Sequence, residues 1–286
     1  MRDTWKRPAP LIAIAVAAAL AVALAVDASR TRDVETSAAE RLASLVAGAQ
    51  LVDLTHDFSQ DTLYWPTAPA RFEHKPLDLG EVEGGWFYAA FTLSAPEHGG
   101  THLDAPYHFA RDGQDAAEVP LERLIAPAVV VDVTAQAAAD ADYRLTRDDL
   151  RAHEKAHGRI PEGAIILLQT GWSAHWPDAK AYFGTETPDS AADLHFPSFG
   201  LEAVKWLVET RRIAAIGVDS ASTDIGASTD FPVHRYAAER NIPGFENLTN
   251  LDRLPPRGAM LAALPMKISD GSGGPLRAVA ILPGED

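Results

Sequence analysis

Side chains that can bind a metal ion or move a proton gather in one short segment of this sequence. Three of its ten histidines and one aspartate lie within eleven residues, at positions 98, 102, 104 and 108. All four positions are even, so an extended chain would direct the four side chains to one face. A helix would place Asp104 away from the first two histidines, and the glycines and proline inside the segment also disfavour a helix. The spacing therefore predicts a strand-like segment with one chemically active face.

The distances within this segment suit one shared ion if the chain bends. Four extended residues span about 13 Å, which is the limit of what two imidazoles on one ion can bridge. We therefore expect a bend between His98 and His102, at Gly99 and Gly100. Two histidines and a carboxylate leave coordination positions open for water and substrate, as catalytic metal sites do. We predict that His98, His102 and Asp104 bind a divalent metal ion.

Other residues are candidates for roles around this ion. Pro106 redirects the chain before His108, so we predict that His108 is a general acid–base residue rather than a ligand. Tyr64, Trp65 and Phe87 are candidates to line a pocket for an aromatic substrate. Trp65 is the strongest of these three candidates because it precedes a proline in an expected loop.

The composition excludes several classes of function. The chain has 286 residues and no cysteine, which rules out disulfides, thiolate metal sites and cysteine nucleophiles. Any metal must be held by histidine, carboxylate, carbonyl or water. The formal net charge is −15, and such a charge disfavours nucleic acid as a partner.

The N-terminus resembles an export signal. Lys6 and Arg7 precede an uncharged apolar run from Leu11 to Val26, which fits the basic and hydrophobic regions of a signal peptide. The run would form a helix of about 24 Å, short for a membrane core of roughly 30 Å. We expect residues 1–28 to be a signal peptide or an N-terminal membrane anchor, which makes the protein periplasmic, extracellular or anchored by this segment only.

The rest of the chain mixes strands and helices in one domain. We expect a linker and short helix at 29–47 and a single catalytic domain at 48–286. Thr146 is a good N-cap for a helix that Gly158 would end, and two more helices are expected at 201–212 and 234–240. This mixture predicts an α/β domain. Valine- and isoleucine-rich runs predict strands at 129–133, 164–168, 213–218, 260–264 and 277–282.

The segment from His98 to Phe109 resembles a known family. It matches every fixed position of H-x-G-T-H-x-D-x-P-x-H-F, the pattern of the cyclase family of metal-dependent hydrolases, which includes bacterial kynurenine formamidase and isatin hydrolase. Further landmarks lie at residues 53–56, 64–66, 169–172, 216–219 and 271–275, so the resemblance extends from about Leu51 to the C-terminus. It implies a swivelling β/β/α-like fold.

The resemblance also implies a site and a reaction. Its metal ligands are His98, His102 and Asp104, and its catalytic residue is His108. Formamidases hold a second ion, for which His234 and Glu246 stand at matching places. The isatin hydrolase type resembles a version with one manganese ion. We therefore expect one or two ions of zinc or manganese, a small-molecule amide substrate, and a homodimer or larger homo-oligomer. Glu246 would either bind the second ion or assist proton transfer.

Two other functions fit part of the pattern. His102, Asp104 and a distal histidine also form the metal-binding triad of non-haem iron oxygenases, whose folds are usually all-β. The extra His98 and the expected helices argue against that class. A non-catalytic exported protein that binds metal or ligand is the other alternative, and the presence of His108 and Glu246 disfavours it.

Overall fold

The computed structural model describes Glu40, Ala43 and residues 47–284. The predicted signal peptide or anchor at 1–28 and most of the predicted linker at 29–47 lie outside the described residues. Among the helices that are described, none combines the length and the apolar character that a membrane crossing requires. Gln50–Leu282 form one compact unit, and it contains every residue singled out above for chemistry.

An eight-stranded sheet organises this unit, and it closes on itself into a barrel-like form because β12 pairs with β4 as well as with β11 and β1. Strands β5, β7, β9 and β10 are parallel neighbours, and the other pairs are antiparallel. In the order of the sheet, the strands are β1 (Gln50–Asp53), β12 (Gly273–Leu282), β11 (Arg257–Pro265), β5 (Ile125–Asp132), β7 (Ile165–Gln169), β9 (Ala215–Val218), β10 (Gly244–Glu246) and β4 (His102–Asp104).

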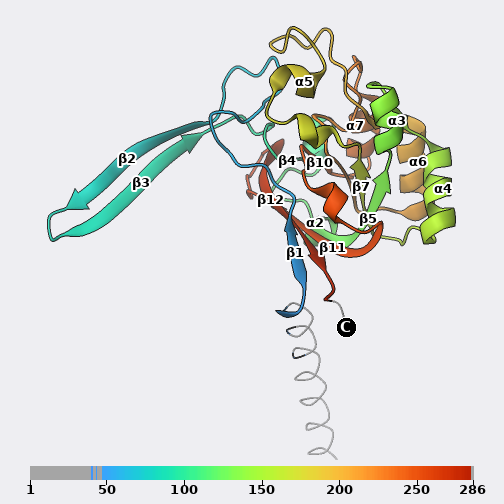
Figure 1. Cartoon of the computed structure of the whole chain (residues 1–286), viewed down its shortest axis with the longest axis horizontal. Helices are drawn as coiled ribbons and strands as arrows, with labels where there is room; N and C mark the ends of the chain where they lie inside the picture. The colour runs from blue at the N-terminus through green and yellow to red at the C-terminus, as the bar shows by residue number, and fades with distance from the viewer. Residues whose placement is uncertain (1–39, 41–42, 44–46, 285–286) are drawn as a thin grey trace, which may run out of the picture. The chain divides into compact units, whose positions relative to one another are not determined.

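Helices cover the parallel strands along one side of the sheet (Figure 1). Leu150 of α4 and Val204 and Leu207 of α6 are buried in one apolar cluster with valines and isoleucines of β5, β7 and β9. Thr146 and Asp149 form a capping box at the start of α4, and Gly158 ends that helix, both as predicted. The helices are α2 (Leu121–Leu124), α3 (Thr134–Ala139), α4 (Arg147–His157), α5 (Ala179–Phe183), α6 (Leu201–Arg211) and α7 (Pro232–Ala238), with 3-10 turns η1 (Pro106–His108), η2 (Trp172–His175) and η3 (Leu251–Arg253).

A second apolar cluster joins the antiparallel strands. Val52, Leu103, Phe245 and Leu261 belong to it and are fully buried. Because β4 and β10 contribute to this cluster, the polar side chains that they carry are held on rigid backbone.

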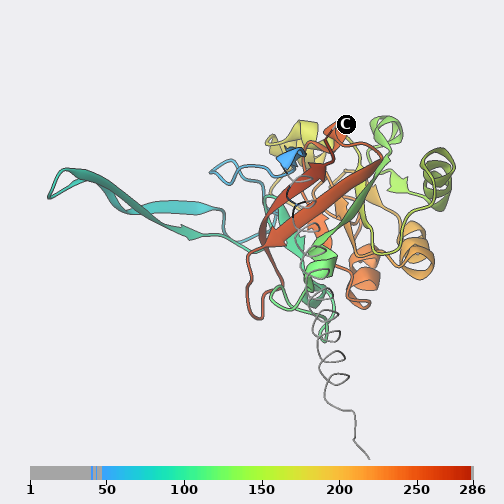
Figure 2. The same ribbon diagram turned by 90° about the horizontal axis from the view of Figure 1, so that it is seen from below.

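A long hairpin stands apart from the sheet. Strands β2 (Glu73–Val82) and β3 (Trp86–Ser94) pair with each other, and both views show them extending away from the other strands (Figure 1 and Figure 2). The sequence reasoning did not predict these two strands. A short parallel pair, β6 (Arg144–Leu145) and β8 (Ser198–Phe199), completes the described strands.

The structure confirms the predicted fold class. All five predicted strands occur, as β5, β7, β9, β11 and β12, and the three predicted helices occur as α4, α6 and α7. The mixture of parallel strands and covering helices is an α/β arrangement, unlike the all-β folds that are usual for the oxygenase alternative.

Candidate metal centre and active site

The histidine-rich segment bends where the glycine pair predicted. Gly100 has a φ of +59°, which side chains other than glycine rarely adopt. A Cβ on Gly99 would overlap the ring of Tyr64, and one on Gly100 would meet the ring of Phe58 at 2.5 Å. Of the segment, His102–Asp104 form a strand, β4, whereas His108 lies on η1. The single strand-like face predicted for all four side chains therefore holds for β4 alone.

Strand pairing brings Glu246 to the segment from far along the chain. Strand β4 is antiparallel to β10, and their register sets His102 opposite Glu246. Helix α7 supplies His234, whose Nε2 lies 3.1 Å from Glu246 Oε1. The structure thus unites the two residues that the family resemblance had implied with the local cluster.

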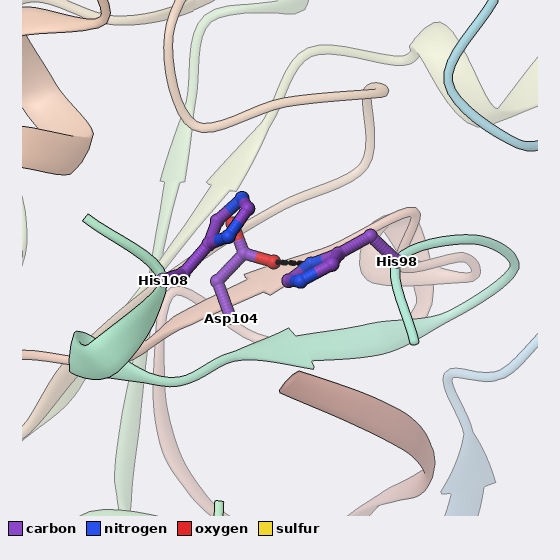
Figure 3. Close-up of side chains that lie close together, drawn as sticks. All are labelled: His98, Asp104 and His108. Atoms are coloured by element: carbon purple, nitrogen blue, oxygen red, sulfur yellow. Dashed lines mark hydrogen bonds and ion pairs between the residues drawn. The ribbon is translucent and has the colours of Figure 1, made fainter. Parts of the chain in front are cut away.

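Asp104 lies at the centre of this cluster. Its Oδ1 is 2.6 Å from His98 Nδ1 and 3.1 Å from His102 Nε2. Its Oδ2 is 3.0 Å from His234 Nε2. Figure 3 shows the rings of His98 and His108 directed toward the Asp104 carboxylate from two different segments. One carboxylate therefore has one oxygen toward His98 and His102 and the other toward His234.

In His98, His102 and His234, the ring nitrogen that points away from Asp104 has a hydrogen-bond acceptor of its own. His102 Nδ1 donates to the carbonyl of Gly100 at 2.9 Å, and His234 Nδ1 donates to Asp224 at 2.7 Å. Asp224 also accepts from the backbone N–H of His234 at 3.0 Å. The sequence reasoning missed Asp224, because a lone aspartate in a loop carries no local signal of such a role.

His98 is held by a two-step chain. Its Nε2 lies 2.8 Å from Ser272 Oγ, which in turn donates to Glu97 at 2.6 Å. Because Ser272 gives its proton to Glu97, it accepts the proton of His98 Nε2. Ser272 falls within the family landmark 271–275, but the sequence reasoning assigned it no role.

The ring nitrogens of His98, His102 and His234 that point into the site face carboxylates, and this arrangement suits a bound cation. With the outer nitrogen protonated, the inner nitrogen of a neutral imidazole carries a lone pair. His102 Nε2 is buried without a hydrogen-bond partner and lies 3.5 Å from Glu246. Lone pairs directed at carboxylates repel them unless a positive charge lies between. Three imidazoles and two carboxylates are also the ligand types that zinc and manganese take.

The pKa values point to the same need for positive charge. Burial acts to lower the pKa of His102, but Asp104 and Glu246 outweigh it and the pKa rises. For His234 burial is likewise outweighed by Asp104, Asp224 and Glu246, so its pKa lies well above the usual value. Burial acts to raise the pKa of Asp104, yet the surrounding histidines hold it well below its usual range.

The ligand atoms fall into two overlapping groups that share Asp104. Those of His102, Asp104 and Glu246 lie within 4.8 Å of one another, and so do those of His98, Asp104 and His108. The predicted set of His98, His102 and Asp104 is thus divided between the two groups. The division of roles between ligands and acid–base residue remains a prediction.

His108 differs from the other three histidines. Its ring stacks on that of His98 at a centroid distance of 3.9 Å. Burial against the site wall lowers the pKa of His108 to about 4, and the charges of His98 and His234 act in the same direction, whereas Asp104 opposes them. A histidine with this pKa is neutral near pH 7 and can accept a proton.

A cavity of about 430 Å³ opens onto the cluster. Of the predicted substrate-binding residues, Tyr64 and Trp65 line it. Phe87 does not line it, because it lies on β3 of the hairpin and is 61% exposed. Further aromatic rings complete the wall, and they come from Phe109, Phe183 and Phe231. Such a wall suits a flat aromatic ligand.

The chain resembles proteins of one family along most of its length. Residues 52–225 match the model of the Cyclase family, described as "Putative cyclase". An isatin hydrolase from Roseibium aggregatum is 35% identical over 256 residues, which cover 84% of this chain and 95% of that protein. A kynurenine formamidase from Salinibacter ruber is 29% identical over 240 residues, which cover 80% of this chain and 96% of that protein.

A solved structure shares the fold. The crystal structure of an isatin hydrolase bound to the product analogue thioisatinate superposes with a TM-score of 0.78. The two chains are 30% identical, and the match covers 87% of this chain and 98% of the other.

Proposed function

Because the chain belongs to the cyclase family of metal-dependent hydrolases, we propose that it hydrolyses the carbon–nitrogen bond of an aryl or cyclic amide. The observation that carries this proposal is that three imidazoles and two carboxylates, with Asp104 at their centre, converge on a cavity with an aromatic wall. The names of the relatives point to isatin and N-formylkynurenine as the substrates to test first.

The residues of this site would divide into two ion positions. His98, His102 and Asp104 would hold a first zinc or manganese ion. Asp104, with His234 and Glu246, would hold a second ion if two are bound. A divalent ion in such a site lowers the pKa of a water molecule and polarises a carbonyl.

His108 is the acid–base residue of this proposal. Its neutral imidazole takes a proton from the attacking water as the water oxygen bonds to the amide carbon. The carbon–nitrogen bond then breaks, and the proton passes from His108 to the leaving nitrogen, so the products are an amine and a carboxylic acid, which gives its remaining proton to solvent and becomes a carboxylate. Trp65 and Tyr64 would orient the aromatic part of the substrate, and the buried Glu246 would assist the transfer if only one ion is bound.

Replacement of His108 tests this assignment. The purified His108→Ala variant should keep the metal content of the wild type and lose about 10²–10⁴-fold in kcat on isatin or N-formylkynurenine. Metal content is measured by elemental analysis and turnover by the change in substrate absorbance. The exposed His175 provides the matched control, His175→Ala, which should keep both.

Two results would count against the proposal. A His108→Ala variant that lost metal and recovered full turnover on reconstitution would make His108 a ligand and not the acid–base residue. A wild-type protein loaded with zinc or manganese that turned over neither amide would remove the proposed substrate class.

A further inference from the structure

Asn247 directly follows Glu246, and its side chain is buried against the histidine-rich segment. Its Nδ2 donates to the carbonyl of Gly100 at 2.8 Å, and the same carbonyl accepts from His102 Nδ1 at 2.9 Å. Its Oδ1 accepts from the hydroxyl of Tyr182 at 2.8 Å. A turned amide would set Oδ1 against the carbonyl oxygen of Gly100, so these bonds require one orientation of the side chain. Asn247 therefore contacts the carbonyl that orients His102.

The backbone of Asn247 is fixed as well as its side chain. Its N–H donates to the carbonyl of Ser220 at 3.0 Å, and its carbonyl accepts from the hydroxyl of Thr101 at 2.6 Å. Its φ is +54°, and asparagine adopts this left-handed conformation more readily than most residues that have a side chain. The bonds to Thr101 and Gly100 therefore tie the segment after Glu246 to a segment 146 and 147 residues earlier in the chain.

The carbonyl of Gly100 depends on this support. Gly100 lies in the bend before β4, at a φ of +59°, so the groups that donate to its carbonyl determine the direction of that carbonyl. The same direction sets the ring of His102, because the Nδ1 proton goes to the carbonyl and the lone pair stays on Nε2. His102 Nε2 lies 3.1 Å from Asp104 and 3.5 Å from Glu246. A small turn of the carbonyl would therefore move a candidate ligand atom.

Tyr182 holds the amide of Asn247 from a rigid base. Tyr182 is fully buried, and Trp172 Nε1 donates to its backbone carbonyl at 2.7 Å. Asp219 accepts from the backbone N–H groups of residues 170–171 at 2.8 and 2.9 Å, which fixes the chain just before Trp172. The two family landmarks that contain Trp172 and Asp219 therefore support Tyr182, a role that the proposed reaction alone does not give them.

We propose that Asn247 is a positioning residue, which fixes the ring of His102 through the carbonyl of Gly100 and is itself oriented by Tyr182. This proposal rests on the metal site of the proposed function, because the ring that Asn247 fixes belongs to that site. Asn247 also lines the cavity, so a direct contact with substrate is the competing role for its amide. The two roles differ in their effect on metal affinity, which changes only if Asn247 positions a ligand.

Removal of the amide alone tests the proposal. Asn247→Gly can keep the left-handed backbone and its two main-chain bonds, because glycine adopts positive φ freely. Asn250→Gly is the matched control, since Asn250 also has a positive φ, of +56°, and its Nδ2 also donates to a backbone carbonyl, that of Asp53, at 2.8 Å. Affinity is measured by titration of zinc or manganese against a competing chelator. We expect about 10–100-fold weaker affinity for Asn247→Gly and the wild-type value for Asn250→Gly.

The hydroxyl of Tyr182 provides a second variant. Tyr182→Phe removes the group that donates to Asn247 Oδ1, and its control, Tyr143→Phe, removes a hydroxyl that donates to Asp149 at 2.8 Å. Tyr182→Phe should weaken metal affinity by a smaller factor than Asn247→Gly, and Tyr143→Phe should leave it unchanged. Cobalt(II) in place of zinc adds a spectroscopic readout, because its visible absorption depends on the geometry of its ligands. The bands should shift in Asn247→Gly and Tyr182→Phe and stay in place in both controls.

An Asn247→Gly variant that binds metal as tightly as Asn250→Gly, with unchanged cobalt bands, overturns the proposal. A raised KM at that unchanged affinity would assign the amide to the substrate instead. Should Asn247→Gly fold poorly, as shown by its Tm without metal, the comparison of Tyr182→Phe with Tyr143→Phe decides in the same way.

The test also separates this proposal from the proposed function. A wild type that binds metal but hydrolyses neither amide would remove the proposed substrate class and leave the role of Asn247 to be decided by affinity, as above. A wild type that binds neither zinc nor manganese overturns both proposals.

Discussion

At the scale of single residues, Ser272 sets the orientation of the His98 ring. Its hydroxyl accepts from His98 Nε2 and donates to Glu97, which leaves His98 Nδ1 toward Asp104. Outer hydrogen bonds of this kind set the tautomer and ring orientation of metal-binding histidines, and their loss typically weakens metal affinity 10–100-fold. We therefore expect Ser272→Ala to weaken zinc or manganese affinity by about that factor, measured by titration against a competing chelator.

Thr210→Ala is the matched control, since Thr210 loses a hydroxyl that bonds only within α6 and its neighbouring arginine. If Ser272→Ala bound metal as tightly as this control, the chain from His98 to Glu97 would have no part in holding the ion. An intact thermal unfolding profile for both variants separates a loosened site from a damaged fold.

At the scale of elements, a histidine on helix α4 makes the stability of the fold depend on pH. Burial lowers the pKa of His153 to about 4 from a usual 6.5, and His157 and Arg257 act in the same direction. The unfolded chain then binds the proton more readily than the folded one, so stability is fully present above pH 6.5 and declines as the pH falls toward 4. The decline is at most about 1.4 kcal/mol per pH unit.

The His153→Gln variant should remove this decline. Relative to wild type, its Tm should improve steadily between pH 7 and pH 4.5, as followed by circular dichroism. His175→Gln is the control because it removes a solvent-exposed histidine. A pH-dependent gap of equal size in the control would assign the effect to the loss of any histidine rather than to His153.

Local patterns predicted elements well where one chain segment determines its own structure. The cap at Thr146 and the stop at Gly158 delimit α4 because both act within one turn of the helix. The same reasoning placed Phe87 in a substrate pocket. In the sequence, an aromatic residue that lines a cavity cannot be told from one on an exposed hairpin. The position of the hairpin depends on packing that no local pattern encodes.

At the scale of the whole molecule, the site depends on pairing between distant strands. His102 and Asp104 could be recognised from spacing alone, because they alternate on one short strand. Glu246 lies 144 residues beyond His102 and reaches it through the register of β4 and β10. His234 arrives on α7, and Asp224 orients it from a loop. Such contacts follow from the closed sheet and could be expected only through the family resemblance.

A site assembled from such distant segments should link metal binding to the stability of the whole domain. An ion that binds the folded chain and not the unfolded one stabilises it by about 2.7 kcal/mol at a hundred times its Kd. In a domain of this size, that corresponds to a fall in Tm of roughly 5–10 °C when a chelator removes the ion. Scanning calorimetry of the loaded, chelated and reloaded protein measures the fall and its recovery.

The Asp104→Asn variant should show little response to the chelator, because Asp104 is the carboxylate common to both ligand groups. An equal Tm for loaded and chelated wild type would mean that the buried histidines and carboxylates are stable without an ion, and the metal centre proposed here would lose its physical basis.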